Sequence, residues 1–191
     1  MKVGLFFGSF NPVHIGHMAL ANYLLEFTDL ERIWFVVSPH NPLKEKKTLL
    51  ADHHRLELVR LAIGDHSKMK ASNIEFKLPQ PSYTTNTLAH LSEKYPQHAF
   101  SLIMGSDNLE SLHKWKNYEV ILQHYSILVY PRPGHDGGKF KAHPSVKMTE
   151  APLMEISSTF LREGIRNKKD LRFFFPEATW NYLREMNFYK K

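Results

Sequence analysis

Short apolar runs with the length of buried strands alternate along this chain with segments whose apolar residues recur at helical spacing. The first run, 3–7, stops at Gly8, and the segment after it carries apolar side chains at i, i+4 and i+7. The alternation continues almost to the end of the chain. It predicts strands at 3–7, 33–37, 74–76, 100–104, 126–130 and 146–149, and helices at 16–27, 52–63, 84–95, 118–124, 158–165 and 177–186.

This order of elements predicts an α/β fold. Strands separated by helices pair in parallel, and a parallel sheet needs helices on both of its faces. We therefore expect a doubly wound, mainly parallel sheet with a short helical C-terminal part that begins at about residue 157. A length of 191 residues fits a single domain, 1–191. Ligands of such sheets bind beyond the carboxyl ends of the strands, so chemistry is expected at residues 8–17, where the first strand ends.

Composition excludes several classes of protein. There is no cysteine, which rules out a disulfide scaffold, a zinc ribbon and a cysteine nucleophile. No apolar run approaches the ~20 residues of a membrane span, so we expect a cytoplasmic protein with no membrane partner. Lysine plus arginine is 25 against 19 for aspartate plus glutamate, and the net charge of +6 suits anionic partners such as nucleotides. The stretch 131–144 is rich in Pro and Gly and is predicted to be a loop.

The segment that leaves the first strand carries the most specific motif. From Gly8 to His17 the chain fits G-x-F-x-P-x-H-x-G-H at all six fixed positions. Gly8 lets the backbone turn tightly and approach a ligand, and amides at the start of the next helix can face an anion. His14 and His17 are three residues apart, so they lie on one helix face and can donate to phosphate oxygens. The plainer alternative is a strand–turn–helix corner with two polar histidines near its cap.

A second segment, residues 156–162, reads I-S-S-T-F-L-R and places three hydroxyls and an arginine at the start of a predicted helix. Hydroxyls, helix amides and a guanidinium can converge there on an anion. The simpler interpretation is that Ser157 or Ser158 acts only as the N-cap of that helix.

Together the two segments resemble the signatures of the nucleotidyltransferase superfamily, whose core is shared with class I aminoacyl-tRNA synthetases. P-S-Y-T at 81–84, G-S-D-N-L at 105–109 followed by Trp115, and P-R-P-G at 131–134 are similar to bacterial-type nicotinate-mononucleotide adenylyltransferases. The resemblance runs from residue 3 to the final helix. It implies a Rossmann-like fold and adenylyl transfer from ATP to nicotinate mononucleotide, giving nicotinate adenine dinucleotide and pyrophosphate. Two positions depart from the family, because Phe7 stands where Gly is usual and Asn11 where Asp is common.

The resemblance also implies roles for single residues. The catalytic set would be His14 and His17, which hold the phosphates, with Lys44 and Arg162, which neutralise the triphosphate. The residues expected to bind ATP are Gly8, Ser9, Phe10, Gly16, Gly105, Asp107, Ile156, Ser157, Ser158 and Thr159. Those expected to bind the mononucleotide are Thr84, Trp115, Lys116 and Arg132.

The implied cofactor is Mg²⁺, held mainly by the ATP phosphates and not by a set of protein ligands. ATP and nicotinate mononucleotide are the expected partners, nucleic acid is not, and pairing with a second copy is left open. Nicotinamide-mononucleotide and phosphopantetheine adenylyltransferases are alternatives of the same class. A nucleic-acid-binding module is an alternative of another class, although no clustered aromatic and basic repeat supports it.

Overall fold

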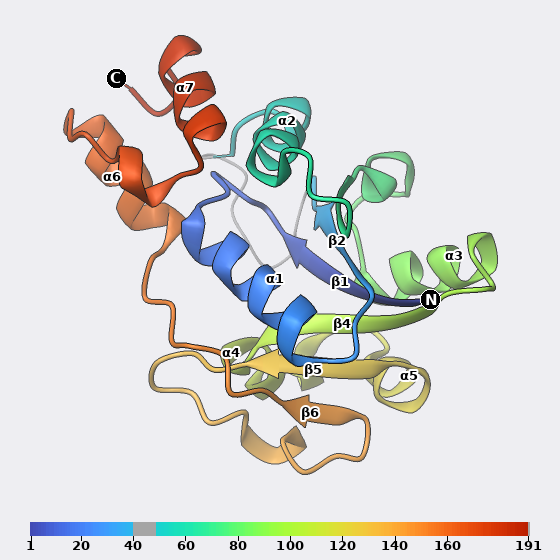
Figure 1. Ribbon diagram of the computed structural model, residues 1–191. Helices are drawn as coiled ribbons and strands as arrows, with labels where there is room; N and C mark the ends of the chain where they lie inside the picture. Colours follow the sequence, from blue (N-terminus) through green and yellow to red (C-terminus); the bar gives the residue numbers. More distant parts are fainter. Residues whose placement is uncertain (40–48, 191) are drawn as a thin grey trace.

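The computed structural model describes residues 1–39 and 49–190. Within these ranges six strands form one sheet in the order β3-β2-β1-β4-β5-β6, and every neighbouring pair is parallel (Figure 1). The strands are β1 (Lys2–Gly8), β2 (Arg32–Val37), β3 (Met69–Ser72), β4 (Ala99–Gly105), β5 (Ser126–Tyr130) and β6 (Val146–Met148). The parallel sheet predicted from the alternation of elements is confirmed.

Helices cover both faces of the sheet, which makes the fold doubly wound. In the described residues the α-helices are α1 (Ile15–Phe27), α2 (Asp52–Ile63), α3 (Thr84–Lys94), α4 (Ser106–Glu110), α5 (Tyr118–His124), α6 (Ser158–Arg166) and α7 (Glu177–Glu185). α1, α2, α6 and α7 pack in one apolar cluster and α3, α4 and α5 in a second. On β2, Phe35 belongs to the first cluster while Trp34 and Val36 belong to the second. Burial on both faces is why the strands form continuous apolar runs.

The strand order reverses at β1, which pairs with β2 on one side and with β4 on the other. In this register Leu5 is aligned with both Trp34 and Leu102. The exits of β1 and β4, at Gly8 and Gly105, therefore flank the switch point where ligands of such sheets bind. Figure 1 shows α6 and α7 lying toward this same carboxyl end of the sheet.

The predicted strand at 74–76 is wrong. Residues Ile74–Lys77 form a 3-10 helix, and the strand, β3, lies just before it at Met69–Ser72. A strand there would place the side chains of Ile74 and Phe76 on one face and that of Glu75 on the other. In the structure Glu75 is 2% exposed, while its two apolar neighbours are only half-buried. Ile74 and Phe76 pack against different apolar clusters at the margin of the sheet.

Two short helical elements were also not predicted. α4 is a five-residue helix directly after β4, too short to show helical periodicity. The predicted loop 131–144 contains one 3-10 turn, Gly138–Phe140. No helix of the described residues is long and apolar enough to cross a bilayer.

Candidate functional site

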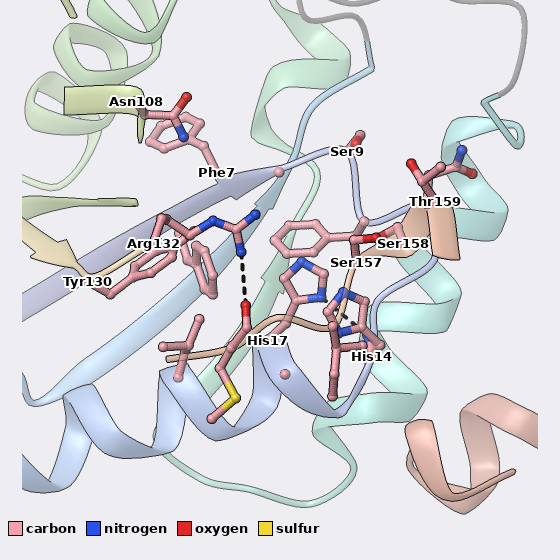
Figure 2. A pocket seen from close by; sticks show the side chains of 18 of the residues that line it. Phe7, Ser9, His14, His17, Asn108, Tyr130, Arg132, Ser157, Ser158 and Thr159 are labelled. Carbon is pink, nitrogen blue, oxygen red and sulfur yellow. Dashed lines mark hydrogen bonds between the residues drawn. The ribbon is translucent and has the colours of Figure 1, made fainter. Parts of the chain in front are cut away.

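A cavity of about 470 Å³ opens at the carboxyl end of β1. Its walls come from the loop after β1, the first turn of α1, the residues that follow β4 and β5, and the start of α6 (Figure 2). The predicted site residues that line it are Gly8, Ser9, Phe10, His14, Gly16, His17, Asp107, Arg132, Ile156, Ser157, Ser158, Thr159 and Arg162. Both sequence motifs therefore meet in one cavity.

His17 is oriented by the backbone of its own motif. The His14 amide donates to His17 Nδ1 over 3.2 Å, and the two imidazole rings lie 3.8 Å apart between centroids. Because Nδ1 accepts this bond, the proton of a neutral His17 is assigned to Nε2. Figure 2 shows the two rings side by side, with Arg132 on one side and Ser157–Thr159 on the other. His17 thus presents a donor to a negatively charged group in the cavity.

His14 caps α1 and is kept neutral. Its side chain is 4% exposed, and burial, with a smaller contribution from the positive charge of Arg132, lowers the pKa of His14 to about 4. At pH 7 the imidazole therefore acts as a neutral hydrogen-bonding group and not as a cation. Its Nδ1 is buried and has no hydrogen-bond partner in the described part of the chain. A Cβ at Gly16 would come within 3.1 Å of this atom, which explains the need for glycine there.

The start of α6 is joined directly to the loop after β1. Ser157 is the N-cap, because its Oγ accepts from the Phe160 amide over 3.2 Å, and it lines the cavity as well. Ser158 Oγ donates to the Pro12 carbonyl over 2.9 Å. Arg162 donates from Nη1 to the Asn11 carbonyl over 2.8 Å, which ties the same two segments a second time.

The side chain of Asn11 acts as a hydrogen-bond acceptor. It is 2% exposed, and its Oδ1 accepts from the Leu50 amide over 3.1 Å and from the Tyr189 hydroxyl over 2.6 Å. A neutral amide meets this requirement with no buried charge. The departure from the family pattern at residue 11 is therefore accommodated by the local hydrogen bonds.

Arg162 offers a direct test of the triphosphate role. Its second nitrogen, Nη2, donates to Thr159 Oγ1 over 3.2 Å, so the planar guanidinium bridges the helix start and the Asn11 carbonyl. We expect Arg162→Lys to raise the KM for ATP by roughly tenfold or more, since lysine lacks the planar fork. The KM for the mononucleotide should stay within about twofold in the same steady-state assay, a far smaller change than loss of one charged contact produces. Arg166→Lys, an exposed change on the same helix, is the matched control, and equal weakening of both substrates would contradict the assignment.

Arg132 lies in the cavity with the histidines and not with the other residues predicted to bind the mononucleotide. Its amide donates to Ser106 Oγ over 2.9 Å and its Nη1 to the Met154 carbonyl over 3.2 Å. Asp107 Oδ1 is 4.0 Å from Arg132 Nε. A Cβ at Gly105 would come within 2.3 Å of that Asp107 oxygen, so a larger residue there would displace the Asp107 carboxylate.

Thr84, Trp115 and Lys116 lie outside the lining of this cavity. Thr84 is the first residue of α3, and its neighbour Thr85 donates from Oγ1 to the Lys116 carbonyl over 2.8 Å. This bond holds the start of α3 against the segment that contains Trp115. Lys116 Nζ lies 4.4 Å from the centre of the Tyr83 ring. The three predicted residues are thus brought together, at a place separate from the cavity. The remaining predicted residue, Lys44, falls outside the described residues.

Sequence reasoning missed part of the cavity wall. The additional lining residues include Phe7, Asn108, Tyr130 and Met154. Tyr130 is the last residue of an apolar strand, and its place at the strand exit was the available signal. Burial raises the pKa of Tyr130 to about 12, so its hydroxyl keeps its proton at neutral pH.

Arg55 of α2 holds the segments next to the cavity in place. No pattern in the sequence indicated this role. Its side chain is 0% exposed, and Nη1 donates to the carbonyls of Ser9 over 2.6 Å and Ser38 over 2.8 Å. Nε donates to the Leu50 carbonyl over 2.9 Å, and Nη2 contacts Asp52 Oδ1 at 2.6 Å. One guanidinium therefore fixes the loop after β1, the exit of β2 and the start of α2.

Comparison with known proteins places the chain in a family. A family model described as cytidylyltransferase-like matches residues 5–164. The chain belongs to the cytidylyltransferase-like family. Within the wider group of similar proteins, a Flavobacterium psychrophilum protein named "Probable nicotinate-nucleotide adenylyltransferase" is 58% identical, and a Flavobacterium johnsoniae protein of the same name is 55% identical. Each alignment covers 100% of both chains.

Solved structures agree on the fold of this cytidylyltransferase-like chain. The Plasmodium falciparum nicotinic acid mononucleotide adenylyltransferase complexed with NaAD superposes with a TM-score of 0.81. The two chains are 19% identical, and the match covers 98% of this chain and 97% of the other. The Rossmann-like fold implied by the sequence resemblance is confirmed.

Proposed function

We propose that this protein transfers the adenylyl group of ATP to nicotinate mononucleotide, forming nicotinate adenine dinucleotide and pyrophosphate, as a single domain spanning residues 1–191. The observation that carries the proposal is the meeting of the two motifs in one cavity, fixed by the bonds from Ser158 to Pro12 and from Arg162 to Asn11. The names of full-length relatives at 55–58% identity support the choice of reaction.

The chemistry needs no nucleophilic side chain. The 5′-phosphate of the mononucleotide is already an anion, and one of its oxygens bonds to the α-phosphorus of ATP while the bond to the departing pyrophosphate breaks. Catalysis then consists of holding the two phosphates in line and stabilising charge on their oxygens. His17 Nε2–H and the neutral His14 supply donors, and Arg162 supplies positive charge at the start of α6.

The residues that line the cavity are compatible with Mg²⁺ that binds together with ATP. Asp107 is the one carboxylate among the lining residues that the structure describes, and no cluster of three or more metal-ligating side chains occurs in residues 1–39 and 49–190. Such a site suits an ion held mainly by phosphates and water, beside which Asp107 would provide one oxygen ligand or hold a water. When bound, the ion supplies positive charge to the phosphate oxygens.

The choice between acid and amide tests the proposed substrate. We expect nicotinate mononucleotide to be preferred over nicotinamide mononucleotide by roughly tenfold or more in kcat/KM. A carboxylate only accepts hydrogen bonds, and the Thr84 hydroxyl with nearby backbone amides offers donors. The measurement is pyrophosphate release with MgATP and each mononucleotide in turn.

Two variants separate ring contact from recognition of the acid. Trp115→Ala should weaken both mononucleotides together and leave their ratio nearly unchanged, because a stacked indole contacts either ring. Thr84→Val should reduce the ratio of kcat/KM for the acid to kcat/KM for the amide, because valine has no hydroxyl to donate to the carboxylate. Comparable turnover of acid and amide by the unmodified protein would refute the acid-specific assignment and favour a nicotinamide or dual-specificity enzyme.

A further inference from the structure

Glu75 is a buried carboxyl that the proposed chemistry does not use. Its side chain is 2% exposed, and within the described residues it forms no ion pair. Glutamate is almost never fully buried unless it is paired. A buried carboxyl without a positive partner is costly, so its surroundings must recover that cost through hydrogen bonds.

The hydrogen bonds of Glu75 converge on the segment that leads into α3, residues 82–87, which we call the α3 entry. Thr87 Oγ1 donates to Glu75 Oε1 over 2.8 Å, and both groups are buried. The hydroxyls of Ser38, at the exit of β2, and Ser82, at the beginning of the α3 entry, also face the carboxyl. One side chain thus faces three hydroxyls, which come from the exit of β2 and from the two ends of the α3 entry.

The backbone of Glu75 reinforces the same connection. Gln80 Nε2 donates to the Glu75 carbonyl over 3.0 Å, while Gln80 Oε1 accepts from Ser82 Oγ over 3.1 Å. The α3 entry is therefore attached to Glu75 at both of its ends, through Ser82 and Gln80 at the beginning and through Thr87 at the end.

The environment of the carboxyl favours its protonated form. Burial raises the pKa of Glu75, and the facing hydroxyls oppose this effect only in part. The carboxyl accepts the Thr87 hydroxyl through Oε1, and a glutamine amide offers an acceptor oxygen at the same place. Glutamine at this position can therefore keep this hydrogen bond, whereas alanine cannot.

We propose that Glu75 is a positioning residue for the mononucleotide site, because it fixes the α3 entry that carries Thr84. Thr85 in the same segment donates to the Lys116 carbonyl over 2.8 Å, so the position of the α3 entry also sets that of the segment beside Trp115. Movement of the α3 entry would displace both sides of the predicted mononucleotide site and leave the cavity at the carboxyl end of β1 unchanged. The inference rests on the proposed function for the identity of the ligand only.

The test compares two substrates and two substitutions. We expect Glu75→Ala to raise the KM for nicotinate mononucleotide at least tenfold and to leave the KM for ATP within about twofold. Glu75→Gln should restore the mononucleotide KM to near its original value. Thr87→Val should reproduce the effect of Glu75→Ala, since it removes the hydroxyl bound to Oε1. The matched control is Thr179→Val, another fully buried threonine, whose hydroxyl lies on the distant helix α7 and donates to the Leu58 carbonyl.

Amide hydrogen exchange keeps this test independent of the reaction. Glu75→Ala should speed exchange at residues 84–87 at least tenfold, with no change at the amides of α7, whatever substrate the protein uses. If exchange at the α3 entry is unchanged, or if both KM values shift together, the positioning role is wrong. Faster exchange in a protein that does not adenylate nicotinate mononucleotide would instead disprove the proposed substrate and leave the role of Glu75 standing.

Discussion

Replacing His17 with alanine is expected to lower kcat/KM by roughly a hundredfold or more, the effect of removing one donor to a transition state. His17 lines the cavity, and the bond from the His14 amide fixes which of its nitrogens donates. The variant loses the bond from the His14 amide to His17 Nδ1 but keeps the backbone hydrogen bonds of the first turn of α1, so the fold should persist. Pyrophosphate release measures the activity, and circular dichroism checks the fold.

His113→Ala is the matched control for this prediction, because His113 is exposed and lies outside the cavity lining. Its turnover should be unchanged. A His17→Ala protein with normal turnover would show that the imidazole does not contact the reacting phosphates. A variant that fails to fold would assign His17 a structural role in the loop.

The second large effect concerns stability. Arg55→Met should lower the free energy of unfolding by about 3 kcal/mol or more, because it removes a fully buried guanidinium that donates to three partly buried carbonyls. The carbonyls of Ser9, Ser38 and Leu50 would all lose a hydrogen bond within 2.9 Å. Methionine fills most of the volume of the arginine side chain. The loss of stability therefore comes from removing the guanidinium and not from opening a cavity.

Urea unfolding of Arg55→Met and of Arg60→Met separates this effect from a general cost of losing an arginine on α2. Arg60 is exposed and makes only a surface ion pair with Glu57 at 3.4 Å, so its replacement should change the stability by less than about 0.5 kcal/mol. Similar losses in the two variants would contradict the role given to Arg55.

The sheet could be predicted from the sequence because its central strands are buried on both faces and form short continuous apolar runs. One of its two edge strands, β3, could not. β3 pairs with only one neighbour, and its four residues, Met69–Ser72, carry too little apolar character to be distinguished from a loop. A strand was predicted at 74–76 instead, where the buried residue is the polar one, Glu75.

The parts of the cavity wall that could be named from the sequence are those whose residues are contiguous. Residues 8–17 and 156–162 each carry a local pattern of hydroxyls, imidazoles and amides that is typical of anion binding. That Ser158 would meet Pro12, across 146 positions, required the fold. Arg55 and Glu75 were missed because a single buried ionisable residue leaves no repeating pattern in the sequence. Only the carbonyls and hydroxyls around such a residue, brought together by tertiary structure, show why it is there.

The bond between Tyr189 and Asn11 spans 178 positions of the chain. A ribosome makes the loop after β1 long before it reaches Tyr189, and a nascent chain that has emerged as far as residue 180 already contains all six strands of the described sheet. It still lacks the hydroxyl that satisfies Asn11 in the finished protein. The loop after β1, which forms part of the proposed phosphate site, is therefore made well before it can gain its full set of contacts.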